Sequence, residues 1–341
     1  MVKNQEMTLL AAVKKNGKWG FINQKGEVVI PCSFYDVGSF EGGLVRVQDQ
    51  ENGPWRYINK YGRTNQRLDD MHAKAPAGMI IGPFKYGIAK VGNYRTKEYS
   101  STTTVYDNAF DFDGHEEYSH SSYTDFVHGY MDRNGNMLTG YDYDSMSPEW
   151  MADEISDGWI KMSRYDNGNT EYMSRTGNRL EGQYGLMSHN FHEGVAFVSK
   201  KVFGMLTKYG YINTNGEMVI PNKWVWCYDF SEGLAAVKEK AKDKYFSYIN
   251  HKGETVIPSQ PWNRAGEFHE GLASVQQRDS AYFGYIDKTG KNVIPYRWEV
   301  AGDFSQGLAP VRDNNQYGFI DKTGKLVISC QWESACGFAK V

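Results

Sequence analysis

The sequence is poor in several features that would identify a function directly. Its 341 residues include only four cysteines, too few for a disulfide framework in a chain of this length. The charges nearly cancel, at a net charge of −3, and Lys and Arg form no run or stripe. Because nucleic-acid binding depends on basic surfaces, we expect no nucleic-acid partner.

Long apolar runs and catalytic motifs are also missing. No stretch of about 18 apolar residues occurs, so we expect no transmembrane helix and no insertion into a membrane. The segment before Leu9 is too short and polar for a signal peptide. This predicts a cytoplasmic protein as the sequence stands, or an exported one if a leader has been removed. Without a nucleophile elbow, phosphate loop, dinucleotide fingerprint or HExxH motif, we expect neither an enzyme nor a cofactor.

What the sequence does contain is a hairpin pattern, seen clearly in residues 282–295. Tyr285 and Ile286 lie in an aromatic and β-branched run that is typical of a half-buried strand. A short polar segment follows and ends at Gly290, the expected left-handed position of the turn. A second apolar run then ends at Pro295, which lacks a backbone donor. The pattern predicts two antiparallel strands.

The same hairpin occurs eight times. Every copy has a strand aromatic and a turn glycine, in the pairs Phe21 and Gly26, Tyr57 and Gly62, Tyr130 and Gly135, Tyr172 and Gly177, Tyr211 and Gly216, Tyr248 and Gly253, Tyr285 and Gly290, and Phe319 and Gly324. A second anchor follows each hairpin, as in the segment FSEGLAAV from Phe230. Repetition of this kind predicts a tandem array, not separate domains.

The repeats divide the whole chain, residues 1–341, into eight units of one β domain. Their approximate bounds are 9–43, 44–87, 88–158, 159–194, 195–233, 234–271, 272–307 and 308–341. Short loops make neighbouring strands antiparallel, so we expect an all-β fold with a three-stranded meander in each unit. Two arrangements fit. An open, curved or superhelical array is favoured by the uneven insertions, and an eight-bladed β-propeller is the alternative.

These residues resemble the WG-repeat, or KWG-repeat, proteins. The name corresponds to Trp19-Gly20 and to the Tyr-Gly or Phe-Gly pairs at Tyr209, Phe283 and Tyr317. The resemblance covers nearly the whole chain and is weaker in units two to four. The family is a bacterial repeat class whose members mostly have no assigned biochemistry. The resemblance therefore implies an architecture more than a ligand or partner.

Unit three carries an insertion, residues 93–127, that is rich in Tyr, Ser, Thr and acidic residues. Two basic and seven acidic side chains give it a net charge of −5. Its alternating pattern and Gly114 predict two long strands joined by a reversal, which together form a protruding β-arm. On a repeat scaffold, such an arm is where a specific function would be added.

Two sets of residues are candidate sites. The ligand-binding candidates are aromatic and comprise Trp224, Trp226, Trp262, Trp298, Trp332, Tyr106, Tyr118 and Tyr123. Exposed rings could stack on sugars or peptides, but an aromatic at one fixed repeat position is more typical of a core. The weak metal candidates lie in the arm and are Asp111, Asp113, His115 and Glu117. They lack the later ligands of a calcium loop, so we expect no metal.

One more pair of motifs looks catalytic at first sight. His192-Glu193 and His269-Glu270 combine a base and an acid, but they occupy variable positions of a repeated turn, which favours solvated corners. The sequence thus predicts a non-catalytic scaffold for recognition of a protein partner or a cell-envelope component. The alternatives are glycan or cell-wall binding through aromatic platforms, and a metal-dependent site on the arm.

Overall fold

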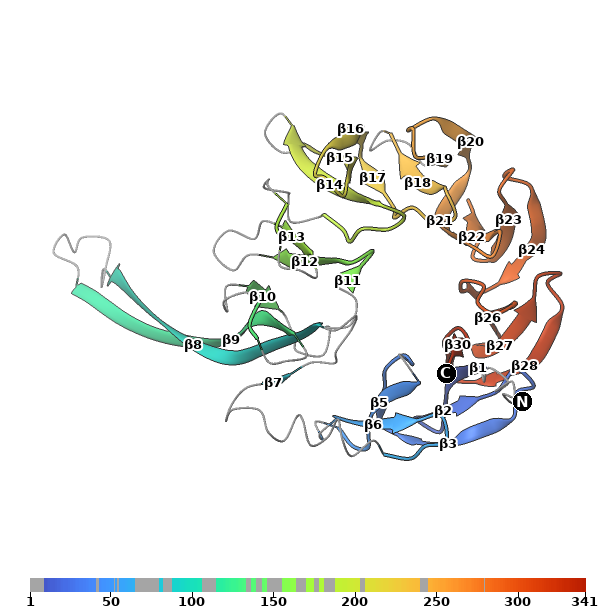
Figure 1. The fold of residues 1–341 in the computed structure, drawn as a ribbon, viewed down its shortest axis with the longest axis horizontal. Coiled ribbons are helices and arrows are strands. Elements are labelled where there is room, and N and C mark those ends of the chain that lie inside the picture. The colour runs from blue at the N-terminus through green and yellow to red at the C-terminus, as the bar shows by residue number, and fades with distance from the viewer. Residues whose placement is uncertain are drawn as a thin grey trace. The chain divides into compact units, whose positions relative to one another are not determined.

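The chain folds as β-strands. The computed structural model describes residues 9–40, 43–51, 53, 55–64, 80–81, 88–105, 115–132, 136–138, 143–145, 155–163, 170–174, 178–180, 188–202, 206–239, 245–278 and 280–341. Every regular element in these ranges is a strand, and the sheets are small and antiparallel (Figure 1). The all-β prediction is therefore confirmed. No helix in the described residues is long and apolar enough to cross a membrane.

Contacts between residues divide the chain into two compact units. The larger unit contains residues 1–73 and 187–341, and the smaller unit contains residues 74–186. That all eight repeats form one array stays a prediction.

The described strands of the larger unit form six sheets. They are β1 (Leu9–Lys15), β2 (Lys18–Ile22), β3 (Val28–Phe34), β4 (Asp36–Val37), β5 (Leu44–Gln48), β6 (Trp55–Asn59), β14 (Val195–Val202), β15 (Leu206–Asn213), β16 (Met218–Trp224), β17 (Trp226–Cys227), β18 (Ala235–Lys238), β19 (Phe246–Ile249), β20 (Thr255–Gln260), β21 (Trp262–His269), β22 (Leu272–Gln277), β23 (Phe283–Asp287), β24 (Asn292–Trp298), β25 (Val300–Ala301), β26 (Leu308–Asp313), β27 (Gln316–Asp321), β28 (Leu326–Trp332), β29 (Ser334–Ala335) and β30 (Ala339–Lys340). The sheet orders are β29-β1-β2-β3 with β30 also on β1, β4-β5-β6, β14-β15-β16, β17-β18-β19-β20, β21-β22-β23-β24 and β25-β26-β27-β28.

Most of these sheets contain at least one strand more than the three that we expected. In the sheet β25-β26-β27-β28, the last three strands are the predicted meander, and β25 comes from the segment just after Trp298. The sequence suggested only a connection there. The segment pairs with the free edge of the next meander, with Val300 opposite Arg312, and so satisfies backbone groups that would otherwise lack partners. Sheets therefore straddle the repeat boundaries.

The hairpin turns owe their shape to an Asn or Asp at the end of the second strand. The Oδ1 atom of Asp287 accepts hydrogen bonds from the backbone N–H groups of Thr289, at 2.9 Å, and Lys291, at 3.1 Å. Gly290 has a φ of 84°, the left-handed conformation predicted for it. Asn23, Asn59, Asn213, Asn250 and Asp321 accept the same pair of bonds in their own turns.

The glycine that precedes the strand aromatic has a steric role. A Cβ atom on Gly284 would lie 2.5 Å from the carbonyl oxygen of Ile294, on the third strand. Gly20, Gly210 and Gly318 meet the third strand of their own sheets at 2.4–2.6 Å. Only glycine allows this approach, so the second residue of each Trp-Gly or aromatic-Gly pair is fixed by backbone contact.

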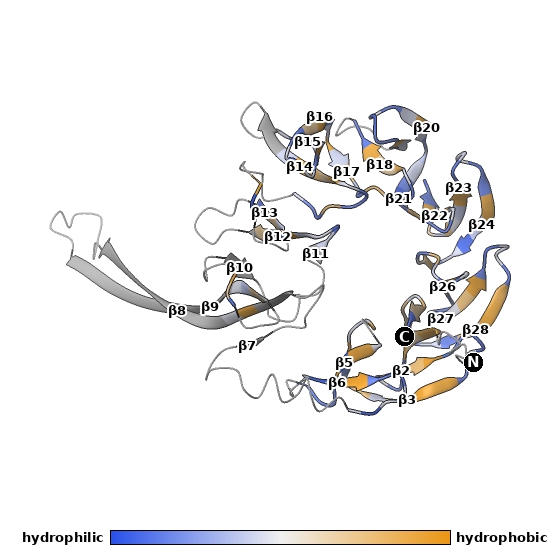
Figure 2. Cartoon of the chain, in the orientation of Figure 1, coloured by the Kyte–Doolittle hydropathy of each residue, from blue (hydrophilic) through white to orange (hydrophobic). Residues whose placement is uncertain are grey.

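Neighbouring sheets of the larger unit pack on one another and share their cores. One cluster joins Tyr285, Ile294 and Trp298 of one sheet to Val311 and Ile320 of the next. Five turn glycines lie over an isoleucine of the preceding sheet, in the pairs Gly62 and Ile30, Gly253 and Ile220, Gly290 and Ile257, Gly324 and Ile294, and Gly26 and Ile328. Apolar residues concentrate on the strands and polar residues at the turns (Figure 2). Within this unit, neighbouring meanders thus bury their apolar residues against one another.

The first and last repeats meet in one sheet. Strand β1 pairs with β29, where Val13 lies opposite Ala335, and with β30, where Leu10 lies opposite Ala339. The carboxylate of Glu333 accepts the backbone N–H groups of Asn16, at 2.8 Å, and Gly17, at 3.0 Å. This junction has the same glycine-on-isoleucine contact as the other four, through Gly26 and Ile328.

The described strands of the smaller unit form two sheets. They are β7 (Ile80–Ile81), β8 (Ile88–Val105), β9 (His115–Asp132) and β10 (Tyr143–Ser145) in one sheet, and β11 (Ile155–Ser156), β12 (Trp159–Ser163) and β13 (Thr170–Ser174) in the other. Strands β8 and β9 pair along their whole length, from Ile88 opposite Asp132 to Val105 opposite His115. The expected pair of long strands is thus present, and from here on the arm means residues 88–132, which include β8, β9 and the insertion 93–127.

Candidate functional site

The repeated tryptophans lie in the core. The exposed fractions of Trp224, Trp262, Trp298 and Trp332 are only 1–3%. Each ring packs into a cluster of buried side chains from its own sheet and the neighbouring one. Covered rings cannot offer a face to a sugar or a peptide, so these four residues do not form the aromatic platform considered from the sequence. Trp226 differs, because half of its surface is exposed.

The other sequence candidates lie in the arm. Tyr106, Asp111 and Asp113 are outside the described residues. The backbones of His115, Glu117, Tyr118 and Tyr123 belong to β9, but their side chains are outside the description. Within the residues that the structure describes, no group of His, Cys, Asp and Glu could hold a metal ion.

All four cysteines are free thiols. Burial raises the pKa of Cys227, and it also raises the pKa of Cys32 and Cys330. A raised pKa keeps the thiol protonated, which suits packing and not nucleophilic attack or metal binding.

The corner that precedes β18 carries a polar cluster that links two repeats. Glu232 has a φ of 52°, a left-handed conformation that costs a non-glycine residue about 1 kcal/mol or more. Its carboxylate accepts the N–H of Gly271, at 2.9 Å, and contacts the ammonium of Lys288, at 3.1 Å. Both partners belong to the next sheet. The bond across the junction offsets the backbone strain and explains why a charged residue occupies a position that suits glycine.

Two further corners repeat this arrangement. Glu193 accepts the N–H of Gly233 and contacts His251, whereas Glu270 accepts the N–H of Gly307 and contacts Lys322. Burial raises the pKa of Glu232, but its bonds to Lys288 and Gly271 outweigh burial and lower the pKa overall. The carboxylate form is therefore the one that the junction favours.

At the junction between the last and first repeats, the charged pair is replaced by neutral residues. Gln306 occupies the position of the corner glutamates and has a φ of 55°. Gln24 occupies the turn position of Lys288 and donates from its amide to the backbone carbonyl of Gln306 at 2.8 Å. This junction therefore depends less on charge than its neighbours do.

The corners that contain His192-Glu193 and His269-Glu270 each place the histidine beside a carboxylate. The Nε2 atom of His192 lies 3.6 Å from Asp229, which also contacts Nδ1 of His189 at 3.0 Å. His269 lies 3.8 Å from Glu267 and 3.5 Å from Asp303. Contact with Glu267 and the nearby charge of Asp303 raise the pKa of His269, whereas burial raises the pKa of Asp303.

Sequence reasoning treated these histidines as solvated corners and overlooked their partners. The available signal was the position before the anchor aromatic, which is acidic at Asp229, Glu267 and Asp303. The hydroxyls of the corner serines, Ser231 and Ser305, donate to carbonyls of the next repeat at 2.6 and 2.7 Å. In the described corners, the histidines, the acidic residues and the serine hydroxyls thus make contacts between consecutive repeats. None of the serine hydroxyls in these described corners is paired with a histidine that could act as its base.

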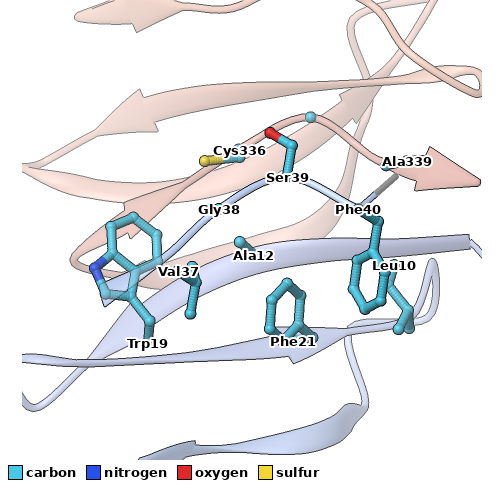
Figure 3. Close-up of a pocket in the computed structure, with 11 residues that line it drawn as sticks. Leu10, Ala12, Trp19, Phe21, Val37, Gly38, Ser39, Phe40, Cys336 and Ala339 are labelled. Atoms are coloured by element: carbon cyan, nitrogen blue, oxygen red, sulfur yellow. The ribbon is translucent and has the colours of Figure 1, made fainter. Parts of the chain in front are cut away.

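A cavity of about 210 Å³ lies where the first and last repeats meet (Figure 3). It is lined by Leu10, Ala12, Trp19, Phe21, Val37, Gly38, Ser39, Phe40, Cys336, Gly337 and Ala339. Phe21 and Phe40 cross edge to face with ring centres 5.1 Å apart. No charged side chain lines the cavity, and its lining is mostly hydrocarbon. Such a cavity lacks the convergent polar groups that orient a substrate.

Comparisons with known proteins identify the repeats but give no activity. Solved structures similar to this chain include virginiamycin B lyase from Staphylococcus aureus, with 13% identity, a TM-score of 0.37, and coverage of 69% of this chain and 87% of that one. Dihydro-heme d1 dehydrogenase NirN has 10% identity and a TM-score of 0.49, over 98% of this chain and 75% of that one. AztD from Citrobacter koseri has 10% identity and a TM-score of 0.41, over 97% of both chains. Likenesses at this level carry no argument about function.

A search of curated proteins gives no significant match. The family model described as the WG containing repeat matches residues 19–52, 209–245, 246–279, 283–317 and 317–340. These regions contain the four aromatic-Gly pairs, five of the turn glycines, and the corners of Glu232, Glu270 and Gln306. The chain therefore contains repeats of the WG type in these five regions.

Proposed function

We propose that this protein is a non-catalytic recognition scaffold in which the arm contacts a protein partner. The observation that carries the proposal is the length of the hairpin formed by β8 and β9. Its strands pair over eighteen residues each. The equivalent hairpins pair five residues in β22 and β23, six in β26 and β27, and eight in β14 and β15.

Neighbouring strands cover only the base of the arm. Strand β7 pairs with Val91 and Gly92, and β10 pairs with residues 126–128. Beyond these residues, β8 and β9 have no other strand partner within the described part of the chain. A two-stranded ribbon is marginally stable by itself, so retaining such a long one favours a function in binding.

The composition of the arm indicates the kind of partner. Residues 93–127 have a net charge of −5, in a chain whose total is −3. An acidic ribbon favours a partner with a basic surface, because complementary charge accelerates association and selects among partners. We expect binding that weakens as salt is added.

We also infer that the repeats form a closed arrangement, the propeller alternative, and not an open array. An open array keeps its first and last repeats apart, whereas β1 pairs with both β29 and β30. Cysteines placed at Leu10 and Ala339, which lie opposite each other, should cross-link within one molecule. If they form only links between molecules, the closed arrangement is wrong.

A matched deletion tests the role of the arm. In the last repeat, Asp313 and Gln316 pair and are joined by Asn314-Asn315, both left-handed. Asn93 and Val127 occupy the corresponding positions in the arm. Replacing residues 94–126 by Asn-Asn should therefore shorten the hairpin to the length of its relatives and keep the pairing of β7 with residues 91–92 and of β10 with residues 127–128.

Immobilised intact and shortened proteins would be compared for capture from the extract and envelope fraction of the source cells, at low and high salt. The proposal expects a partner that binds the intact protein at low salt and loses at least tenfold in affinity for the shortened one. A partner held equally by both variants would show that another surface is responsible. The absence of any captured partner would count against recognition altogether.

A further inference from the structure

The third strand of each regular repeat lies at the edge of its sheet, and most of these edges carry a proline. Pro31, Pro221, Pro258 and Pro295 occupy equivalent positions in β3, β16, β20 and β24. Proline on an edge strand removes a donor that another chain could use, and so discourages pairing between sheets. In β28 the same position is Ser329.

The backbone of this position faces away from its own sheet. A Cβ atom on Gly318 of β27 would meet the carbonyl oxygen of Ile328 and the nitrogen of Cys330, which shows that these groups face inward. Along a strand, backbone groups point alternately to its two sides. Ser329, between Ile328 and Cys330, therefore directs its N–H and carbonyl outward. The prolines of the other repeats fit the same place because no donor is needed there.

The side chains along this edge are accessible. Leu326, Val327, Ser329 and Gln331 are all exposed, and Leu326 and Val327 expose 41% and 47% of their surfaces. The pairing of β27 with β28 shifts register on both sides of Phe319, so the strand bulges around Ser329. The bulge is shared with β3, β16 and β24 and offers some protection from pairing. Strand β28 therefore differs from β3, β16 and β24 in lacking the proline at this position.

The sequence of this edge is complementary to itself. An antiparallel pair of β28 strands centred on Ser329 places Lys325 of one copy opposite Glu333 of the other, at both ends. Lys325 is exposed, and Glu333 is an exposed carboxylate whose oxygens each accept one backbone N–H. A carboxylate has lone pairs for further donors, so the ammonium can be accommodated. Such symmetry suits a twofold interface between identical chains.

We propose that the outer edge of β28 pairs with β28 of a second copy of this chain, centred on Ser329. At the centre, each Ser329 donates its N–H to the Ser329 carbonyl of the other copy. The bulge limits the length of the pairing, so the interface is smaller than the roughly 1,200 Å² of stable complexes. The dimer should therefore form reversibly and depend on protein concentration.

The variant Ser329→Pro tests the proposal, because β24 accepts proline at the same position with the same pairing, Tyr285 opposite Ile294. Ser329→Ala is the matched control, since it keeps the N–H. Analytical ultracentrifugation over a wide concentration range should show association of the native protein and of Ser329→Ala. Ser329→Pro should associate at least tenfold more weakly, with an unchanged melting temperature.

A native protein that stays monomeric up to millimolar concentration would overturn the proposal. So would a Ser329→Pro variant that associates like the native chain, because the contact would then lie elsewhere. If Ser329→Pro unfolds, hydrogen exchange decides: the Ser329 amide of the native protein must become more protected as concentration rises. An amide that exchanges at the same rate at every concentration would also refute the pairing.

Discussion

The hydroxyl of Tyr285 donates a hydrogen bond to the backbone carbonyl of Gly302, 2.7 Å away. The bond fastens the strand aromatic to the segment that leads into the next repeat. Tyr211 and Tyr248 make the same bond, to the carbonyls of Tyr228 and Gly266. The tyrosines of these repeats thus connect one sheet to the start of the next, in addition to filling the core.

Replacing Tyr285 with Phe should therefore cost about 1–2 kcal/mol, because a partly buried carbonyl loses its donor while the ring remains. The fold accepts phenylalanine at this position, since Phe319 is the counterpart of Tyr285 in the last repeat. Chemical denaturation of the two proteins measures the cost. Tyr282→Phe, at an exposed tyrosine, is the control and should change stability little. Equal effects of both substitutions would contradict a specific role for the bond.

Substitution of the glycine in an aromatic-Gly pair should be far more damaging. Gly284→Ala puts a Cβ atom 2.5 Å from the carbonyl oxygen of Ile294, and neither strand can move without breaking the sheet. We expect a loss of about 3 kcal/mol. Gly337→Ala is the matched control, because its nearest neighbour would be 3.6 Å away, and it should change stability by less than about 0.5 kcal/mol. The midpoints of chemical denaturation of the two variants and of the native protein measure both effects.

The corner glutamate gives a prediction that depends on pH. Because the pKa of Glu232 is lowered in the folded protein, its charge adds stability above the ordinary value of 4.5. That contribution disappears as the pH falls through the folded value. Glu232→Gln should thus be less stable than the native protein at pH 7, by about 0.5 kcal/mol for a partly exposed pair, and equal to it near pH 3. A difference that persists in acid would assign the effect to shape instead of charge.

For His269, the change of stability with pH has the opposite sign. Its pKa is raised in the folded protein, so protonated His269 adds stability below its ordinary value of 6.5. This stability is lost as the pH rises through the folded value. His269→Gln should therefore cost more at pH 5.5 than at pH 8.5, as thermal unfolding at the two pH values would show. Removing one acid with Asp303→Asn should reduce the dependence, and an unchanged dependence would exclude the pair as its source.

Local features of the fold could be predicted because each depends on residues close in sequence. The turn at Gly290 follows from a polar segment that ends in glycine, and the long arm follows from alternation on both sides of Gly114. The packing of Trp298 also followed from its fixed repeat position. In each case, a short stretch of sequence contains the whole physical cause.

The missed features depend on residues that are far apart in sequence. Asp303 becomes a partner of His269 only because consecutive repeats stack, and a single repeat does not show which corner positions meet. Strand β25 looked like a connection, since two residues carry no recognisable period. The pairing of β1 with β29 joins segments from opposite ends of the sequence, which no local pattern specifies.

Asn16 and Glu333 are 317 positions apart, yet they are directly bonded. A ribosome makes β1 long before β29 and β30, the partners of its outer edge. Bringing such distant segments together is slow, because the entropy of the intervening chain must be lost before any contact is gained. A nascent or prematurely terminated chain would therefore present an unprotected strand edge, which is a substrate for chaperones and proteases.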